Sequence, residues 1–213
     1  MGSMATTELG PGAWAPGGVD GGDEERWLAA LRRGPAGDPA AAEALVAATY
    51  RRTYRALVRL TGGDADLAAD LTQESYRKAW AALPRFDGRS RFSTWLFRIA
   101  YTTFLNHARR PRVVVPFGGG GGETEDAEAG LAAVADPAPP ADQTLVERGA
   151  RDRLRRAVLA LPDDLRYTVT ARFWGELPVP EIARQEGVTG AAVRKRLKKA
   201  MLLLAAHLEE EPR

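Results

Sequence analysis

The sequence predicts an all-α protein made of two small helical domains, which a long, flexible, acidic linker joins. Apolar residues recur at helical spacing along most of the chain, and no segment alternates for long enough to indicate a strand. Between residues 113 and 143 this pattern gives way to a run of five glycines, four prolines and six acidic residues. Such a stretch is unusual inside one compact domain, so we expect it to separate two.

The charge of the chain divides at the same places. The overall net charge of +2 averages segments that differ strongly from one another. Residues 23–112 carry a net charge of +6, residues 113–143 one of −6, and residues 144–213 one of +4. We therefore expect two domains that face a polyanion and a linker of the opposite sign.

Composition excludes several classes of protein. The 213 residues suffice for one large domain or two small ones. The absence of cysteine excludes disulfides, thiolate metal sites and a cysteine nucleophile. His107 and His207 are not spaced as a metal-binding pair. No apolar run has the length of a membrane span, and no signal-peptide pattern is present. We expect no metal, no cofactor, no membrane insertion and a cytoplasmic location.

The first domain, residues 23–112, is expected to hold helices over residues 23–59, with an interruption near 34–39, and over residues 64–83 and 92–110. Gly62 and Gly63 predict a helix end, and Asp64 predicts the N-cap of the next helix. A short basic loop, residues 85–91, precedes the last helix, which should end at Pro111. Residues 1–22, rich in glycine and proline, predict a disordered extension that begins like an expression tag.

The second domain, residues 144–213, is expected to hold helices over 144–161, from Pro162 onward, and over 180–186 and 190–208. Proline suits the first turn of a helix, and the aspartates after it complement the helix dipole. Helical spacing places Leu154, Val158 and Leu161 on one stripe of the first helix. It predicts that Leu165, Val169, Arg172 and Phe173 mark the buried side of the next helix.

Residues 178–200 have the pattern of a helix-turn-helix. Gly187 permits the left-handed turn, Val188 fills the space between the helices, and Thr189 caps the second helix. Val193 and Leu197 form its buried pair, which turns outward the four cations Arg194, Lys195, Lys198 and Lys199. Such a helix fits the major groove of DNA, where each neutralised phosphate releases counterions. The alternative is an ordinary solvated basic face.

The first domain carries two further patterns. One polar stripe of the 64–83 helix consists of Asp70, Gln73, Glu74 and Arg77, and it is either a solvated face or a docking surface for a partner protein. Aromatic and basic side chains alternate from Arg85 to Phe104, as in proteins that stack single-stranded bases on rings. Trp95 and Ile99 fit a core position better. The loop residues have few apolar neighbours in sequence.

Taken together, these patterns resemble a known family. Residues 70–100, DLTQESYRKAWAALPRFDGRSRFSTWLFRIA, are similar to region 2 of the small extracytoplasmic-function (group 4) sigma factors of bacteria. Residues 161–200, LPDDLRYTVTARFWGELPVPEIARQEGVTGAAVRKRLKKA, are similar to region 4 of the same proteins. The order and spacing of D-x-x-Q-E and P-R-F-x-G-x-S-x-F-x-T-W-L are far more specific than a helix-turn-helix alone.

The resemblance implies a non-catalytic promoter-specificity subunit whose partners are core RNA polymerase and promoter DNA. Region 2 would dock on the coiled coil of the β′ subunit and capture unpaired bases of the −10 element, and region 4 would dock on the β flap and recognise the −35 duplex. The linker would thread toward the active-site cleft of polymerase, where its acidic charge suits a basic channel. Family members are often held inactive by an anti-sigma protein, which the resemblance adds as a further partner.

The resemblance also assigns residues. Polymerase docking falls on Asp70, Gln73, Glu74 and Arg77. Recognition of the −10 element falls on Phe86, Asp87, Arg89, Ser90, Arg91, Phe92, Arg98, Thr102 and Asn106. Recognition of the −35 element falls on Arg194, Lys195, Lys198 and Lys199.

Two positions depart from the family pattern. Thr102 stands where the family usually has asparagine, so one hydroxyl replaces an amide that both donates and accepts. The −35 helix begins with Gly190, Ala191 and Ala192, which offer no polar side chain. Readout at its start must therefore rest on backbone, methyl contacts or DNA shape.

Two other classes of function remain to be weighed. A stand-alone helix-turn-helix regulator would use residues 23–112 for dimerisation or for an effector. An enzyme acting on nucleic acid is disfavoured, because the glycine run at 118–122 lacks the lysine and hydroxyl residue of a phosphate-binding loop. The close carboxylates Asp64, Asp66 and Asp70 fit a helix cap and a helix face.

Overall fold

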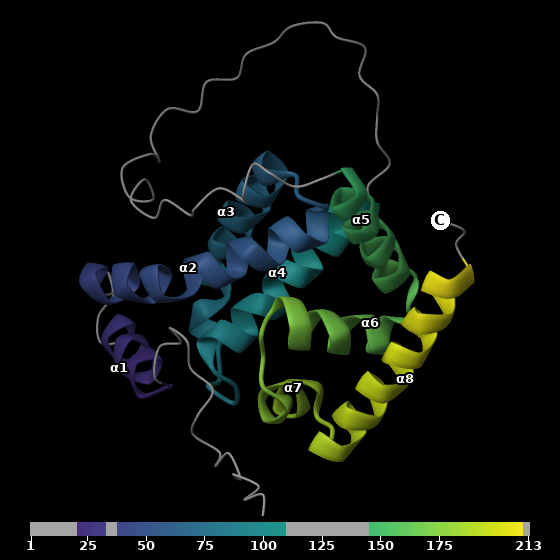
Figure 1. The fold of residues 1–213 in the computed structure, drawn as a ribbon. Helices are drawn as coiled ribbons and strands as arrows, with labels where there is room; N and C mark the ends of the chain where they lie inside the picture. The colour runs from purple at the N-terminus through teal and green to yellow at the C-terminus, as the bar shows by residue number, and fades with distance from the viewer. Residues whose placement is uncertain (1–20, 33–37, 110–144, 211–213) are drawn as a thin grey trace, which may run out of the picture.

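A computed structural model describes residues 21–32, 38–109 and 145–210 of the chain, and this part contains helices and no strand, so the all-α prediction is confirmed there. Figure 1 shows the elements in two groups. The first consists of α1 (Gly21–Leu31), α2 (Pro39–Thr61), α3 (Ala65–Ala82) and α4 (Phe92–Arg109). The second consists of α5 (Leu145–Ala160), α6 (Asp163–Val169), α7 (Val179–Glu186) and α8 (Gly190–Glu210). The linker predicted at 113–143 lies outside the described residues.

Local signals set the ends of the helices in the first group. The Asp38 carboxylate accepts the N–H groups of Ala40 and Ala41 and caps α2. Gly62 ends that helix in the left-handed conformation, with φ of 80°. The Asp64 carboxylate then accepts the N–H of Leu67 and caps α3, as the sequence predicts.

The helix-turn-helix is also confirmed as a local structure. Gly187 ends α7 with φ of 65°, and the Thr189 hydroxyl accepts the N–H of Ala192 in the first turn of α8. Val188 packs against the apolar cluster that contains Ile182 and Val193, and Val193 is fully buried. The turn therefore orients α8 through one positive-φ glycine, one cap and two apolar contacts.

The prediction that Phe173 is buried is wrong. A π-helix spans Thr170–Trp174 directly after α6, and its wider turn changes the helical register. Phe173, placed on the buried side by α-helical spacing, is 50% exposed as a result. Val158 and Leu161 are buried, whereas Leu154 on α5 is 41% exposed.

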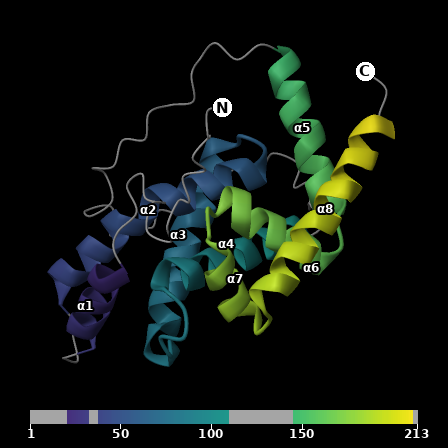
Figure 2. The same cartoon turned by 60° about the horizontal axis from the view of Figure 1, so that its bottom comes forward.

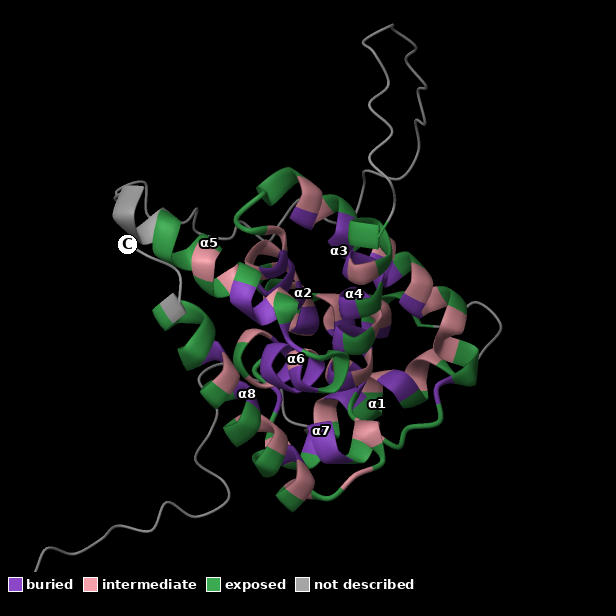
Figure 3. Ribbon diagram, turned by 90° about the vertical axis from the view of Figure 1, so that its right-hand side faces the viewer, coloured by how far each residue is buried: buried purple, intermediate pink, exposed green. Residues whose placement is uncertain are grey.

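The two groups of helices pack against each other along an interface, here called the seam. Its centre is one apolar core that both groups share. Leu57, Phe97 and Tyr101 of the first group belong to the same buried cluster as Tyr167 and Ile182 of the second. Figure 2 shows α6 and α7 beside α4, and Figure 3 shows buried residues gathered where α2, α4, α6 and α7 meet. The periodicity of the sequence predicts two domains but carries no information that they pack together.

Gly175 lies close to Phe97 across the seam. A Cβ atom on this residue would come 2.6 Å from the ring carbons Cδ2 and Cε2 of Phe97, which is itself buried. The φ of −80° at Gly175 is open to any residue. Glycine is therefore required by the Phe97 ring rather than by the backbone conformation.

We expect Gly175→Ala to lower the free energy of unfolding by about 1–3 kcal/mol, because the added methyl overpacks the seam. Urea unfolding followed by circular dichroism measures the loss. Phe97→Leu in the same chain should recover part of it by making room for the methyl. Gly149→Ala, in α5 with nothing within 4 Å, is the control and should not destabilise the protein. Equal stabilities of Gly175→Ala and the control would contradict the assignment.

Candidate nucleic-acid and polymerase interfaces

The basic residues of α8 lie as the helix-turn-helix pattern predicts. Arg194, Lys195, Lys198 and Lys199 are all exposed, on the side opposite the buried Val193. Arg196 behaves differently, because its guanidinium lies 3.5 Å from the Asp164 carboxylate and 3.7 Å from that of Glu186. It ties α8 to α6 and α7, which leaves the other four cations available to a ligand.

The loop before α4 is built on aromatic packing. Phe86 is only 6% exposed, with its ring centre 4.9 Å from that of Trp95 and 6.3 Å from that of Phe92. Arg32 covers the Phe86 ring at 5.8 Å and donates to the Phe86 carbonyl. The expectation that loop residues lack apolar neighbours is therefore wrong for Phe86, because residues of α1 pack into the same cluster.

The polar residues of this loop remain accessible. Asp87 and Arg89 are exposed, and the Asp87 carboxylate accepts the N–H of Arg89 at 3.1 Å and pairs with its guanidinium at 3.2 Å. Gly88 between them has φ of 73°. Ser90 is half-buried and Arg91 exposed. The loop thus presents polar groups above buried rings.

Two buried carboxylates meet the start of α4, and sequence reasoning missed both. Glu24 of α1, 4% exposed, accepts the N–H of Ser93 at 3.3 Å. Glu181 of α7, 3% exposed, accepts the N–H of Arg91 and the hydroxyl of Thr94, each at 3.4 Å. Both satisfy donors near the positive end of the helix. In sequence each is one glutamate among many, and only the fold distinguishes them.

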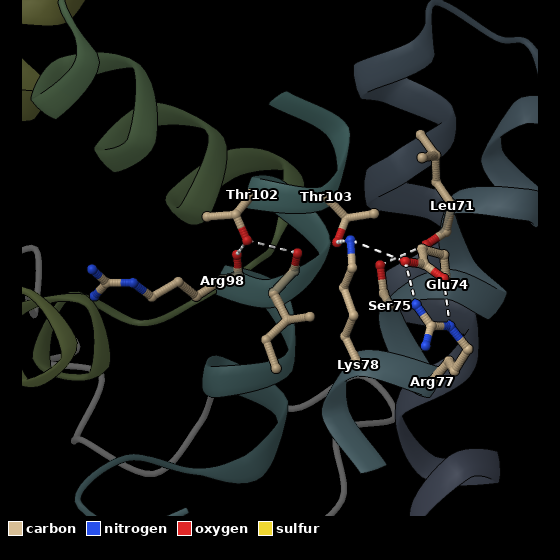
Figure 4. A network of polar contacts seen from close by, with 9 residues as sticks. Leu71, Glu74, Ser75, Arg77, Lys78, Arg98, Thr102 and Thr103 are labelled. Carbon is tan, nitrogen blue, oxygen red and sulfur yellow. Dashed lines mark hydrogen bonds and ion pairs between the residues drawn. The ribbon is translucent and has the colours of Figure 1, made fainter. Parts of the chain in front are cut away.

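Farther along α4, the predicted −10 residues lie on the surface with different partners. Arg98 donates to the carbonyl of Gln185 at 3.2 Å and to the carboxylate of Glu186 at 3.4 Å. The Thr102 hydroxyl donates to the carbonyls of Arg98 and Ile99, both at 2.9 Å (Figure 4). The hydroxyl proton of Thr102 is therefore used within α4, and a lone pair on its oxygen remains free to accept a hydrogen bond. Asn106 is exposed one turn later.

The polar stripe of α3 is also exposed, apart from the half-buried Glu74. Figure 4 shows Glu74 between Arg77, which donates to it at 2.7 and 2.8 Å, and Lys78, at 3.2 Å. Hydrogen bonds from Arg77, and secondarily from Lys78, lower the pKa of Glu74 to about 2. Glu74 is therefore a fixed anion on this surface, and Asp70 and Gln73 lie beside it.

The described residues show no group of histidine and acidic side chains arranged to hold a metal ion. Among the helices of residues 21–32, 38–109 and 145–210, none is long and apolar enough to cross a membrane.

Comparisons with known proteins identify both groups of helices. The family model for sigma-70 region 2 matches residues 26–113, and that for sigma-70 region 4 matches residues 151–204. The structure of CnrH in complex with the cytosolic domain of CnrY is similar, with a TM-score of 0.58 and 20% identity, covering 89% of this chain and 99% of CnrH.

A second similar structure is the sigma factor RpoE in complex with the anti-sigma factor NepR from Bartonella quintana. Its TM-score is 0.48 at 20% identity, covering 78% of this chain and 96% of RpoE. No curated protein matches the chain. Together the two family models match well over half of the chain, with region 2 ahead of region 4. The chain belongs to the sigma-70 family, as an extracytoplasmic-function sigma factor that acts with core RNA polymerase in initiating transcription at promoters.

Proposed function

We propose that this sigma factor binds the −35 duplex with the exposed face of α8 and captures the unpaired −10 element with the 85–91 loop and the outer side of α4. The observation that carries the proposal is the set of four exposed cations on the second helix of the helix-turn-helix, Arg194, Lys195, Lys198 and Lys199. A helix presented in this way fits the major groove. A stand-alone regulator would not need the region 2 that precedes it.

Within α8, Arg194 and Lys198 lie four residues apart on one side of the helix, where they would contact bases. Lys195 and Lys199 would bind phosphates on the flank. The first turn offers little to base edges, because Ala191 and Ala192 carry only methyl groups. Specificity at that end would come from methyl contacts and DNA shape.

For the −10 element, the burial of Phe86 and Phe92 assigns their rings a supporting role. Polar groups of Asp87, Arg89 and Ser90 form the rim above those rings, and they would hold an unpaired base. Thr102 and Asn106 would contact the bases that follow along α4. Thr102 can offer an acceptor, because its proton is already committed to its own helix.

Docking on core polymerase would use Asp70, Gln73, Glu74 and Arg77 of α3. The Glu74–Arg77 pair keeps a defined geometry, and Asp70 and Gln73 present one carboxylate and one amide at the surface. Polymerase would supply all the chemistry, so the chain would need no cofactor. We place its action in the cytoplasm. An anti-sigma protein would be a further partner, and the structure of CnrH in complex with the cytosolic domain of CnrY shows a chain of similar fold bound to a second protein.

The experiment that tests this function is transcription in vitro with core polymerase on genomic promoter fragments. The chain should co-purify with core polymerase and direct initiation at defined sites. A chain that binds DNA but neither joins core polymerase nor supports initiation would instead be a stand-alone regulator.

Arg194→Ala and Lys198→Ala should each weaken binding of the −35 duplex by about 1–3 kcal/mol if the side chain reads a base. If the lost contact is instead to a phosphate, the slope of the logarithm of the binding constant against the logarithm of the salt concentration should be shallower by about 0.9. Fluorescence anisotropy over a salt series measures both. Arg55→Ala, an exposed cation of α2, is the charge-matched control. Variants that bind like this control would refute the role of α8.

Asp70→Ala combined with Gln73→Ala should reduce the affinity for core polymerase while the circular dichroism of the chain stays helical, because both side chains are exposed. Glu43→Ala, which removes an exposed carboxylate from α2, should leave binding intact. Native gel shift with purified core polymerase compares the variants. Undiminished holoenzyme formation would rule out docking through this stripe.

The Glu74 carboxyl should titrate near pH 2 in carbon-13 NMR, and Arg77→Ala should raise its pKa more than Lys78→Ala. Since its folded pKa lies below the unfolded value, the pair stabilises the protein above the ordinary pKa of glutamate, and this is lost as pH falls toward 2. The effect on stability should be small, because the side chain is about a third exposed. An ordinary titration midpoint would contradict the pairing.

A further inference from the structure

Four arginines of region 2 contact a single stretch of region 4. Arg52 and Arg59 lie two turns apart on α2, and Arg91 and Arg98 have the same spacing at the start of α4. All four reach residues 173–186, the end of the π-helix, the following turn and α7. We call these four residues the arginine face and the arrangement that covers it the closed form.

The α2 half of the arginine face binds backbone oxygens. Arg52 donates to the carbonyl of Gly175 at 2.6 Å and to that of Glu176. Arg59 donates to the carbonyls of Phe173 and Trp174, both at 3.3 Å, and its guanidinium lies 3.8 Å from the Glu176 carboxylate. Carbonyls at the C-terminal end of a helix lack helical partners and carry partial negative charge.

The α4 half binds mainly carboxylates. The buried Glu181 pairs with Arg91 at 3.8 Å and with Arg184 at 2.8 Å, in addition to accepting from Arg91 N–H and Thr94. Arg98 pairs with Glu186 and donates to the Gln185 carbonyl. The side chains of Arg91 and Arg98 are each 50% exposed, so residues 173–186 pair with them and cover about half of each.

Region 4 thus offers the arginine face a row of oxygen atoms, the same chemistry that a DNA backbone offers. Guanidinium groups bind phosphate oxygens in the way they bind carboxylates, through directed N–H donors. Burial at the seam lowers the pKa of Arg52, so an oxygen-rich partner is needed to compensate its charge. Arg91 and Arg98 belong to the proposed −10 set, whereas Arg52 and Arg59 belong to none of the interfaces above.

We propose that the arginine face is a surface for the backbone of the −10 strand, and that residues 173–186 cover it in the closed form by presenting oxygen atoms in place of phosphates. This inference rests on the proposed function, because two of the four arginines belong to the −10 set. Glu181 is the central competitor, since it occupies the start of α4 and pairs with Arg91. Binding of the −10 strand requires the two domains to separate.

Only open molecules can bind DNA at this surface, so the apparent DNA affinity is the intrinsic affinity multiplied by the fraction of molecules that are open. If about a tenth are open, removal of the competitor raises the apparent affinity about tenfold. DNA binds only the open form at this surface, so DNA must also shift the domains apart. These two effects are linked, and both are measurable on the full chain.

Opening can be followed by energy transfer between two dyes. The chain has no cysteine, so Ala47→Cys in α2 and Ala205→Cys in α8, both exposed and outside the seam, provide unique labelling sites. Glu181→Gln keeps the shape of the side chain and removes its charge. It should change the transfer efficiency toward that of separated domains and strengthen binding of a short mixed-sequence single strand about tenfold.

Two further variants make this test specific. Glu209→Gln, at the exposed end of α8, makes the same charge change and should leave both readouts unaltered. Gly175→Ala opens the seam by a different route, through the Phe97 ring, without any change of charge. It should therefore also strengthen strand binding. If Glu181→Gln and Gly175→Ala both bind DNA as Glu209→Gln does, the covering role of region 4 is overturned.

The role of the arginines is tested in the opened background. In a chain carrying Glu181→Gln, Arg52→Ala and Arg59→Ala should each weaken strand binding and reduce the logarithmic salt slope by about 0.7 per lost phosphate contact. Arg55→Ala removes an exposed cation of the same helix and should have a smaller effect. Equal effects at all three positions would overturn the assignment of the arginine face.

Failure of this inference is distinguishable from failure of the proposed function. Glu181→Gln retains the residues of α3 and α8 that the proposed function uses. A chain that starts transcription normally with core polymerase but fails the opening and salt tests overturns only the arginine face. A wild-type chain that starts no transcription overturns the proposed function itself.

Discussion

Phe97 lies against the backbone of residue 175 because that residue is glycine, and the seam between the two domains is built around this contact. The Phe97 ring centre lies 6.2 Å from that of Tyr167, and Tyr101 lies 5.3 Å from Tyr167 in an edge arrangement. These rings bring the end of the π-helix onto α2 and α4. The carbonyls of residues 173–176 consequently come within reach of Arg52 and Arg59, which positions the polar contacts around the aromatic ones.

The seam places two demands on α4. One side of this helix carries Phe97 and Tyr101 into the shared core, while its start and outer side carry residues assigned to the −10 element. Around the rings, the seam is rich in arginine, glutamate and backbone carbonyls, a composition closer to a transient interface than to the interior of one domain. Water can replace each of these polar partners when the domains separate, so the apolar rings supply most of the cohesion.

Local signals in the sequence predict local structure well in this chain. Gly62, Asp64, Gly187 and Thr189 fix helix ends through backbone conformation and caps, which depend on immediate neighbours. Prediction fails where distant segments decide. Phe86 looks like a loop residue until α1, which is distant in sequence, packs over it. Phe173 is a different case, because the π-helix that contains it changes the register locally. Glu181 has no distinguishing sequence signal, because its role depends on α4 lying against α7. The outward cations of α8 were predictable, because the buried side of one helix fixes its exposed side.

The closed form leaves two of the proposed interfaces exposed and covers part of the third. The cations of α8 and the stripe of α3 are accessible in the same arrangement in which Glu181 and Glu186 hold Arg91 and Arg98. Contacts through α3 and α8 therefore do not compete with the seam, whereas contacts along α4 do.

It follows from the proposed arginine face that polymerase and the −35 duplex can bind first. Whether the domains then separate depends on the distance between the bound positions of α3 on polymerase and α8 on the −35 duplex. If that distance is longer than the distance between α3 and α8 in the closed form, binding at both sites would pull residues 173–186 away from region 2. The cost of breaking the seam would be met by binding at sites that the seam does not touch, and capture of the −10 strand would be the last step.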